Sequence, residues 1–240
     1  MANAVDVARE CAEVILLRKD LMTLEQAVSA GRRTFGNIVK YIKITVSSNV
    51  GNSLSMLAAS ALLPFLPMLP LQVLAQNLCF DLSQLALAFD RVDEPSLRRP
   101  RTFDPRDLAR FVFCLGPVNT LADLATFAIL WRIMGPHGSP ALLRTGWFAE
   151  NLLTQAAAVH LLRSKARPSA RHHAAGPVPL ATVAVMLTGL YLPFSPLASM
   201  LNMQALPLSY FPMLAAVLGG YCAATLAVKA CYMRSAAPWL

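Results

Sequence analysis

Two apolar segments near the start of the chain carry polar residues at helical spacing. They cover about residues 41–63 and 71–89, and a turn with three prolines joins them. Each is about long enough to cross a bilayer, which takes roughly 20 residues at 1.5 Å per residue. In the first segment Ser48, Asn52 and Ser55 are four and three residues apart, so they share one helical face, with Asn49 at its flank. The pattern predicts a membrane-spanning helix with a polar stripe.

The second segment repeats this spacing with a carboxylate in the stripe. Asn77, Asp81 and Gln84 are again four and three residues apart. If the two segments form a hairpin, both stripes can face each other in mid-membrane. A carboxylate there costs roughly 2.5–3.5 kcal/mol on insertion scales and is by default a functional-site hypothesis. Carboxylate and amide oxygens suit Mg²⁺, Ca²⁺ or Na⁺ rather than soft metals. The candidate ligands are Asp81, Asn52, Asn77, Asn49, Gln84 and Ser48. For each, the alternative is a hydrogen bond to a neighbouring helix.

The composition places most of the chain in a membrane. Of its 240 residues 56% are hydrophobic and only 14% are charged, against about 25% charged in a soluble domain. We therefore predict an all-α membrane protein, with a cytoplasmic stalk helix over residues 21–40 that runs into the first of six transmembrane helices. The predicted spans are about 41–63, 71–89, 111–134, 147–162, 177–192 and 210–233. Residues 90–110, 135–145 and 193–209 are predicted loops.

The basic residues predict the orientation. Of the 21 lysines and arginines, all but Arg132 and Arg144 lie before or at the start of the first span, in the 90–110 and 163–173 segments, or near the C-terminus. Basic residues gather on the cytoplasmic side of membrane proteins. Both termini are therefore expected in the cytoplasm, and the protein is expected to be a multi-pass protein of the cell (inner) membrane. The net charge of +8 need not mean nucleic acid, because basic residues in cytoplasmic loops set the topology of a membrane protein. The expected partner is membrane lipid, and no nucleic acid is expected.

Two further acids fall inside predicted spans. Asp123 lies four residues after Asn119, and Glu150 lies near the predicted outward end of the 147–162 segment. Either acid could serve ion or proton traffic, or hydrogen-bond to partners such as Asn119 or Arg132. His160, near the cytoplasmic end of the same segment, is expected to be structural.

Several segments resemble the C-terminal membrane part of P-type ATPases, and most closely the bacterial magnesium-importing branch. The resemblance covers nearly the whole chain. Residues 5–17 (VDVARECAEVILL) resemble the end of the phosphorylation domain, and residues 31–43 (GRRTFGNIVKYIK) resemble the stalk of the fifth membrane helix. Residues 77–84 (NLCFDLSQ) are similar to the sixth helix, where an Asn-x-x-x-Asp pair binds the transported ion. Residues 89–101 and 207–212 (PLSYFP) resemble the following loop and the last helix.

The resemblance implies that the six spans are helices five to ten of a ten-helix pump and that Mg²⁺ is the transported ion. Residues 1–20 would then be a remnant of the phosphorylation domain, and residues 41–234 the C-terminal membrane domain. Phosphorylation elsewhere would tilt the stalk and move the Asn52 helix against the Asp81 helix.

The chain departs from the family in what it lacks. The phosphorylated aspartate, the nucleotide and actuator domains and helices one to four are not in this sequence. Whether the chain acts as an enzyme is therefore left open; it is expected not to hydrolyse ATP alone, and to use ATP only through domains outside it. It would be a fragment, a split gene product, or one part of a pump whose other domains are on a separate chain. The alternatives are a non-catalytic remnant, a regulatory subunit of another transporter and, more weakly, a passive channel.

Overall fold

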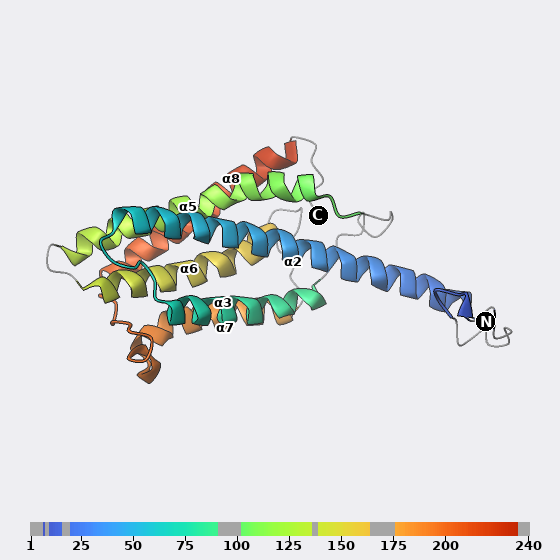
Figure 1. Ribbon diagram of the computed structural model, residues 1–240, viewed down its shortest axis with the longest axis horizontal. Coiled ribbons are helices and arrows are strands. Elements are labelled where there is room, and N and C mark those ends of the chain that lie inside the picture. The colour runs from blue at the N-terminus through green and yellow to red at the C-terminus, as the bar shows by residue number, and fades with distance from the viewer. Residues whose placement is uncertain are drawn as a thin grey trace.

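The computed structural model describes residues 7, 10–15, 20–90, 102–135, 139–163 and 176–234, and within them the chain is an all-helical bundle (Figure 1). The prediction of an all-α fold is confirmed. The α-helices longer than ten residues are α2 (Leu21–Leu62), α3 (Pro70–Gln84), α5 (Pro105–Met134), α6 (Pro140–Leu162), α7 (Pro177–Tyr191) and α8 (Tyr210–Arg234). A 3-10 turn, η1 (Leu85–Phe89), extends α3, and two more, η2 (Leu192–Phe194) and η3 (Pro196–Ala198), follow α7.

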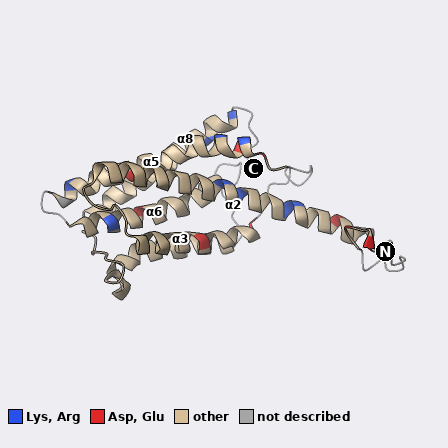
Figure 2. Cartoon of the chain, viewed as in Figure 1, with Lys and Arg blue, Asp and Glu red and all other residues tan. Residues whose placement is uncertain are grey.

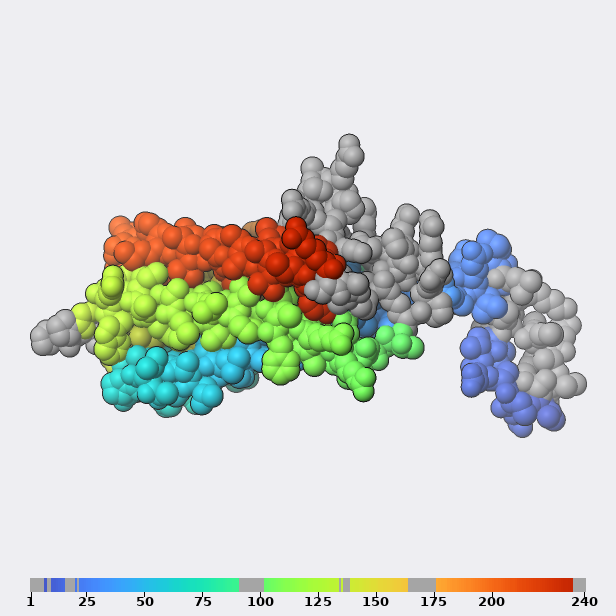
Figure 3. All heavy atoms as spheres, turned by 90° about the horizontal axis from the view of Figure 1, so that it is seen from above, coloured from blue at the N-terminus to red at the C-terminus, as the bar shows by residue number. Residues whose placement is uncertain are grey.

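Helix α6 lies at the centre of this bundle. The helices α3 and α7 pack on one side of it and α5 and α8 on another, while α2 packs chiefly along α5. The space-filling view shows α8, α5 and α2 side by side, with the N-terminal part of α2 extending beyond the bundle (Figure 3). A single unbroken helix therefore covers both the predicted stalk and the first predicted span.

Two helices begin earlier than the sequence pattern predicts, at residues assigned above to loops. Helix α6 begins at Pro140, where Ser139 Oγ accepts a hydrogen bond from the Ala141 N–H (3.2 Å). Helix α5 begins at Pro105, where Asp104 Oδ1 accepts one from the Arg106 N–H (2.9 Å). Serine and aspartate caps followed by proline are strong helix-start signals. The last six residues of each predicted loop, 140–145 and 105–110, are therefore helical and not loop, because apolarity rather than capping set those boundaries.

The helices differ in how far their own composition suits a membrane. Among the described residues, three helical segments are long and apolar enough to cross one: Pro105–Ile133, Pro177–Phe194 and Tyr210–Arg234. The other three long helices carry more polar residues. In α6 these polar residues are buried against protein, since nearly every position from Leu143 to Leu162 is buried. The polar groups of α6 therefore meet neighbouring helices and not lipid.

One end of the bundle is fastened by buried ion pairs. The Asp90 carboxylate, fully buried, pairs with Lys40 Nζ (3.0 Å) and with Arg163 Nη1 (3.1 Å). Lys43 Nζ pairs with Asp107 Oδ2 at 2.7 Å. Elsewhere along the bundle charged residues are sparse (Figure 2). These pairs join α2 to the segment after α3, to the end of α6 and to the start of α5, so the stalk is tied to the bundle where it enters it.

Candidate functional site

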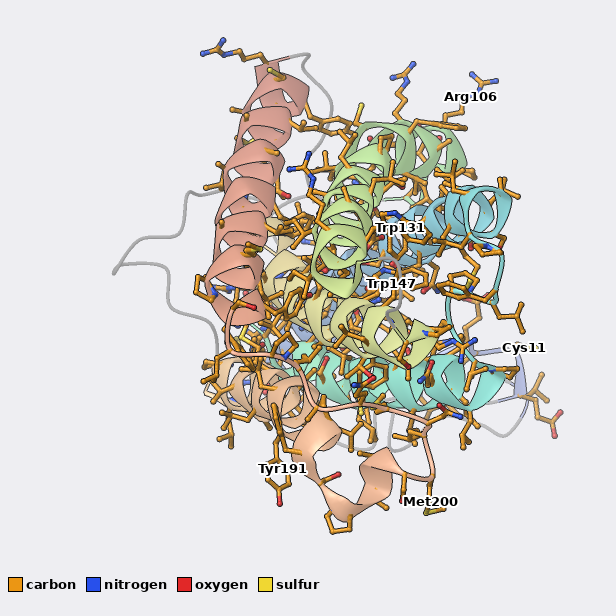
Figure 4. The ribbon with its side chains drawn as sticks, turned by 90° about the vertical axis from the view of Figure 1, so that its left-hand side faces the viewer. Cys11, Arg106, Trp131, Trp147, Tyr191 and Met200 are labelled. Carbon is orange, nitrogen blue, oxygen red and sulfur yellow. The ribbon has the colours of Figure 1, made fainter. Side chains whose placement is uncertain are left out.

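The polar stripe of α2 faces α5 and not α3. Asn119 Nδ2 of α5 donates hydrogen bonds to Asn52 Oδ1 (2.8 Å) and to Asp123 Oδ2 (3.3 Å). Ser55 Oγ of α2 donates to the same Asp123 oxygen (2.5 Å), and Trp147 Nε1 of α6 donates to Asp123 Oδ1 (2.9 Å). Three helices therefore meet at one carboxylate, which is 0% exposed. Trp147 lies inside the bundle, whereas Tyr191 and Met200 lie at its edge (Figure 4).

This junction depends on a close approach of α2 to α5. A Cβ atom added at Gly51 would lie 2.8 Å from Asn119 Cβ and 3.0 Å from the Gly116 carbonyl oxygen. Thr120 Oγ1 also donates to the Gly51 carbonyl oxygen (3.1 Å). Small residues allow helix backbones to approach in this way in membrane proteins. A side chain at position 51 would push Asn119 away from Asn52.

Glu150 of α6 lies against this junction. It is 0% exposed, and neither of its carboxyl oxygens accepts a hydrogen bond from a described residue. Its carboxyl group is within hydrogen-bonding reach of the Asp123 carboxyl. Because α6 begins at Pro140, Glu150 is about 15 Å along its helix at 1.5 Å per residue, and not near the outward end as predicted. Of the two partners predicted for these acids, Asn119 is found, while Arg132 is exposed and contacts neither.

The strongest predicted ligand, Asp81, lies outside the junction, and so do Asn77 and Asn49, whereas Asn52 lies within it. Asp81, Asn77 and Asn49 are exposed, and their side chains hydrogen-bond to no residue that the structure describes. On α3 the two polar side chains stand among exposed leucines such as Leu78 and Leu82. Asp81 lies about 16 Å along α3 from Pro70 at 1.5 Å per residue, about half of the roughly 30 Å hydrocarbon core.

The buried face of α3 carries a polar set of which only Gln84 was predicted as a ligand. Gln72, Gln76 and Gln84 are buried. Gln72 Nε2 donates to the Leu201 carbonyl oxygen (2.8 Å), and Thr45 Oγ1 of α2 donates to Gln84 Oε1 (3.1 Å). Steps of four residues from Gln72 to Gln76 and Phe80 are the signal that could have found this face. The expectation that the stripes of α2 and α3 face each other is therefore wrong, because α3 packs on α6 and α7 and makes little contact with α2.

The predicted ligands are thus not brought together by these helices. Asn52 joins Asn119 and Asp123, Gln84 joins Thr45, and Asp81 stands apart. Within the described parts of the chain, no group of three His, Cys, Asp or Glu side chains could hold a metal ion. His160 Nε2 lies 2.8 Å from Thr182 Oγ1 and links α6 to α7, so it has the structural role expected for it.

A small polar cavity lies next to Asn119, towards the end of the bundle that holds the ion pairs. Its volume is about 10 Å³, and its polar lining residues are Ser47, Ser48, Asn119, Tyr221 and Thr225. That is room for about one water molecule. The polar contacts of Asn119 therefore extend from the Asp123 carboxylate to this cavity.

Comparison with known proteins identifies the family. Residues 65–231 match the family model described as cation transporting ATPase, C-terminus. The chain is 50% identical over 234 residues to the magnesium-transporting ATPase, P-type 1, of Escherichia coli K12, covering 97% of this chain and 26% of that protein. A Salmonella typhimurium protein of the same name is 45% identical over 99% of this chain, and it too is covered to 26%. The calcium-transporting ATPase of Bacillus subtilis is 31% identical over 80% of this chain and 22% of its own length. The chain spans about a quarter of the length of these relatives. It belongs to the cation-transporting P-type ATPases and corresponds to their C-terminal membrane part.

Proposed function

We propose that this chain is the cation-binding membrane part of a P-type ATPase that imports Mg²⁺ across the inner membrane. The observation that carries the proposal is the exposed Asp81, beside Asn77 and about 16 Å along α3 from Pro70, which hydrogen-bonds to no residue that the structure describes. A carboxylate among leucines at that depth cannot face lipid without a large cost. The face must therefore meet water, a cation or further helices. Water, a cation and further helices are all present where a longer pump encloses an ion path.

The relatives favour Mg²⁺ as the transported ion. The proteins that are 50% and 45% identical to this chain are named magnesium-transporting, and the one named calcium-transporting is 31% identical. Mg²⁺ keeps several of its waters and is usually held by one or two carboxylates. One carboxylate, Asp81, with the amides of Asn77 and Asn49, suits that habit, and Asn52 can add an amide oxygen if it releases Asn119. ATP hydrolysis would come from domains outside this chain.

The form of α2 supports a coupling role. It continues from the stalk to Asn52 without a break, and the ion pairs of Lys40 and Lys43 fix it to the bundle where it enters. A movement of the stalk would therefore be transmitted along this unbroken helix to Asn52. The gathering of basic residues at this end favours a cytoplasmic position for it and for both termini, which with six spans gives an even number of crossings.

Uptake of Mg²⁺ by the complete pump that contains this chain tests the proposal. The test compares Asp81→Ala with Thr188→Val, which removes an exposed hydroxyl that only bonds its own helix backbone. In cells without other Mg²⁺ uptake systems, Asp81→Ala should reduce uptake to background at an unchanged amount of protein in the membrane. Thr188→Val should leave uptake unchanged. Normal uptake by Asp81→Ala would refute the site, and uptake of Ca²⁺ in place of Mg²⁺ would refute the proposed cargo.

A further inference from the structure

We propose that Asp123 and Glu150 form a proton-binding site between α5 and α6, in which Glu150 carries one proton and donates it to the Asp123 carboxylate. This site is separate from the proposed cation site at Asp81, and its test does not depend on the direction or cargo of transport. The ligand of this site is a proton, which Glu150 holds as a neutral carboxylic acid in the middle of the bundle.

The hydrogen bonds around Asp123 fit an ionised carboxylate. It accepts from Ser55 Oγ, Asn119 Nδ2 and Trp147 Nε1, so donors from α2, α5 and α6 all point at it. Donors that converge on a carboxylate stabilise its charged form. Asp123 is thus the better acceptor of the two acids.

The surroundings of Glu150 are the opposite. It is completely buried, and no described residue donates a hydrogen bond to either oxygen. A second negative charge against Asp123, without donors of its own, would be repelled and poorly solvated. A proton on Glu150 removes that charge and supplies Asp123 with a further hydrogen bond, as in other pairs of carboxyl groups that share one proton.

Among the described residues, no lysine or arginine is placed to neutralise the pair. The titratable groups near Glu150 are the Asp123 carboxyl of α5 and the phenols of Tyr210 and Tyr221 of α8. Tyr210 Oη donates instead to the Gly146 carbonyl oxygen at 2.9 Å. No described lysine or arginine forms an ion pair with either acid, and α2, α3 and α7 bring no ionisable group to Glu150. A divalent cation is also a poor occupant, because the donors to Asp123 already occupy its oxygens.

The proton on Glu150 also affects the neighbouring contact between Asn119 and Asn52. The Asn119 amide lies between Asp123 and Asn52, and its Nδ2 group bonds to both. A pair that shares one proton keeps Asp123 in place to hold Asn119, which in turn fixes the Asn52 carboxamide. Two charged acids would push α5 and α6 apart and release that contact.

Infrared spectroscopy of the purified protein, complete with any further domains, tests the proposal. At mildly alkaline pH exposed carboxyl groups are ionised, so a carbonyl band of a protonated carboxylic acid that shifts in D₂O reports a buried one. The band should be present in the wild type, be lost in Glu150→Gln and shift in Asp123→Asn. It should remain in Glu25→Gln, since Glu25 is exposed on the stalk part of α2. Glu150→Gln should fold, because its amide can donate to Asp123 in place of the proton.

Three results would overturn the proposal. The first is no such band in the wild type, and the second is a band that Glu150→Gln leaves intact. The third is a band that appears only after divalent cations are chelated, which would make the pair a cation site. Asp81→Ala should keep the band while losing uptake. Failure of the proton site and failure of the transport proposal therefore give different results.

Discussion

Asp81 and Asp123 are both aspartates within helices of the bundle, and their surroundings are opposite. Asp123 is 0% exposed and accepts hydrogen bonds from three helices. Asp81 is exposed and accepts none from a described residue. A carboxylate whose bonding capacity is filled within the chain holds helices together, while one with free capacity can take a ligand. Hydrogen-bond satisfaction, more than position in a helix, separates Asp123 from Asp81, the acid proposed as the cation ligand.

The largest expected effect on stability comes from Asp123→Ala. It removes the acceptor of three buried donors, and a buried donor left unsatisfied costs about 1–3 kcal/mol, although a single interhelical bond in membranes is worth only about 0.6–1.7 kcal/mol. We expect the free energy of unfolding to fall by about 3 kcal/mol. Unfolding in mixed detergent, followed by tryptophan fluorescence, measures this.

A matched control for Asp123→Ala is Thr188→Val, which removes a polar group from an exposed position of α7. It should unfold as the wild type does. If Asp123→Ala were as stable as this control, the three donors would have other acceptors and the contrast with Asp81 would lose its basis.

Gly51→Ala should have the next largest effect. The added methyl group would meet Asn119 Cβ at 2.8 Å and a backbone carbonyl oxygen at 3.0 Å, so α2 and α5 must separate. Overpacking of this kind costs about 1–3 kcal/mol. Gly31 of the same helix has nothing within 4 Å of an added Cβ, and Gly31→Ala should be neutral or stabilising by up to about 1 kcal/mol, because alanine favours helix. Equal stability of the two variants, measured by the same unfolding experiment, would contradict the close approach.

The sequence predicts one member of this comparison better than the other. Asp81 is found at once as an acid in an apolar run, and the all-α fold follows from the length of such runs. The Asp123 junction needs the register of α2 against α5, which the spacing of Ser48, Asn52 and Ser55 leaves open. That spacing shows that the three residues share a face but not which helix the face meets. Gly51, which allows α2 to approach α5 closely, is one of several glycines in α2.

The buried position of Glu150 could not be predicted for a different reason. The apolar run suggested a helix from Trp147, which places Glu150 near an end. The observed helix begins at Pro140, after the cap at Ser139, so Glu150 lies in its middle. The capping signal was present in the sequence, but the burial of almost the whole of α6 is set by the packing of five other helices around it.

Trp147→Phe should have a smaller effect, because it removes one donor and keeps the ring. Its Nε1–H donates to Asp123, and the ring packs edge-on against Phe127 with centroids 4.8 Å apart. Loss of one hydrogen bond should lower the free energy of unfolding by about 1 kcal/mol. The exposed Trp131 gives the matched control, since Trp131→Phe should cost nothing measurable. The two variants should also differ in the quenching of their tryptophan fluorescence by a water-soluble quencher, because Trp147 is buried and Trp131 is exposed. A Trp147→Phe variant with wild-type stability would show that Ser55 and Asn119 suffice for Asp123.

The smallest expected effect on stability comes from Asp81→Asn. The change keeps the shape of the side chain and an oxygen ligand but removes the charge. Because Asp81 bonds to no described residue, stability should change by no more than about 0.5 kcal/mol. Mg²⁺ uptake should nevertheless fall to background, since amide oxygens alone hold a hard divalent cation poorly. Asp123→Asn should show the opposite pattern, in which the free energy of unfolding is reduced whatever the effect on Mg²⁺ uptake. If Asp81→Asn were instead as destabilising as Asp123→Ala, the Asp81 carboxylate would have a structural partner outside this chain, and its exposure would mark a helix contact rather than a cation site.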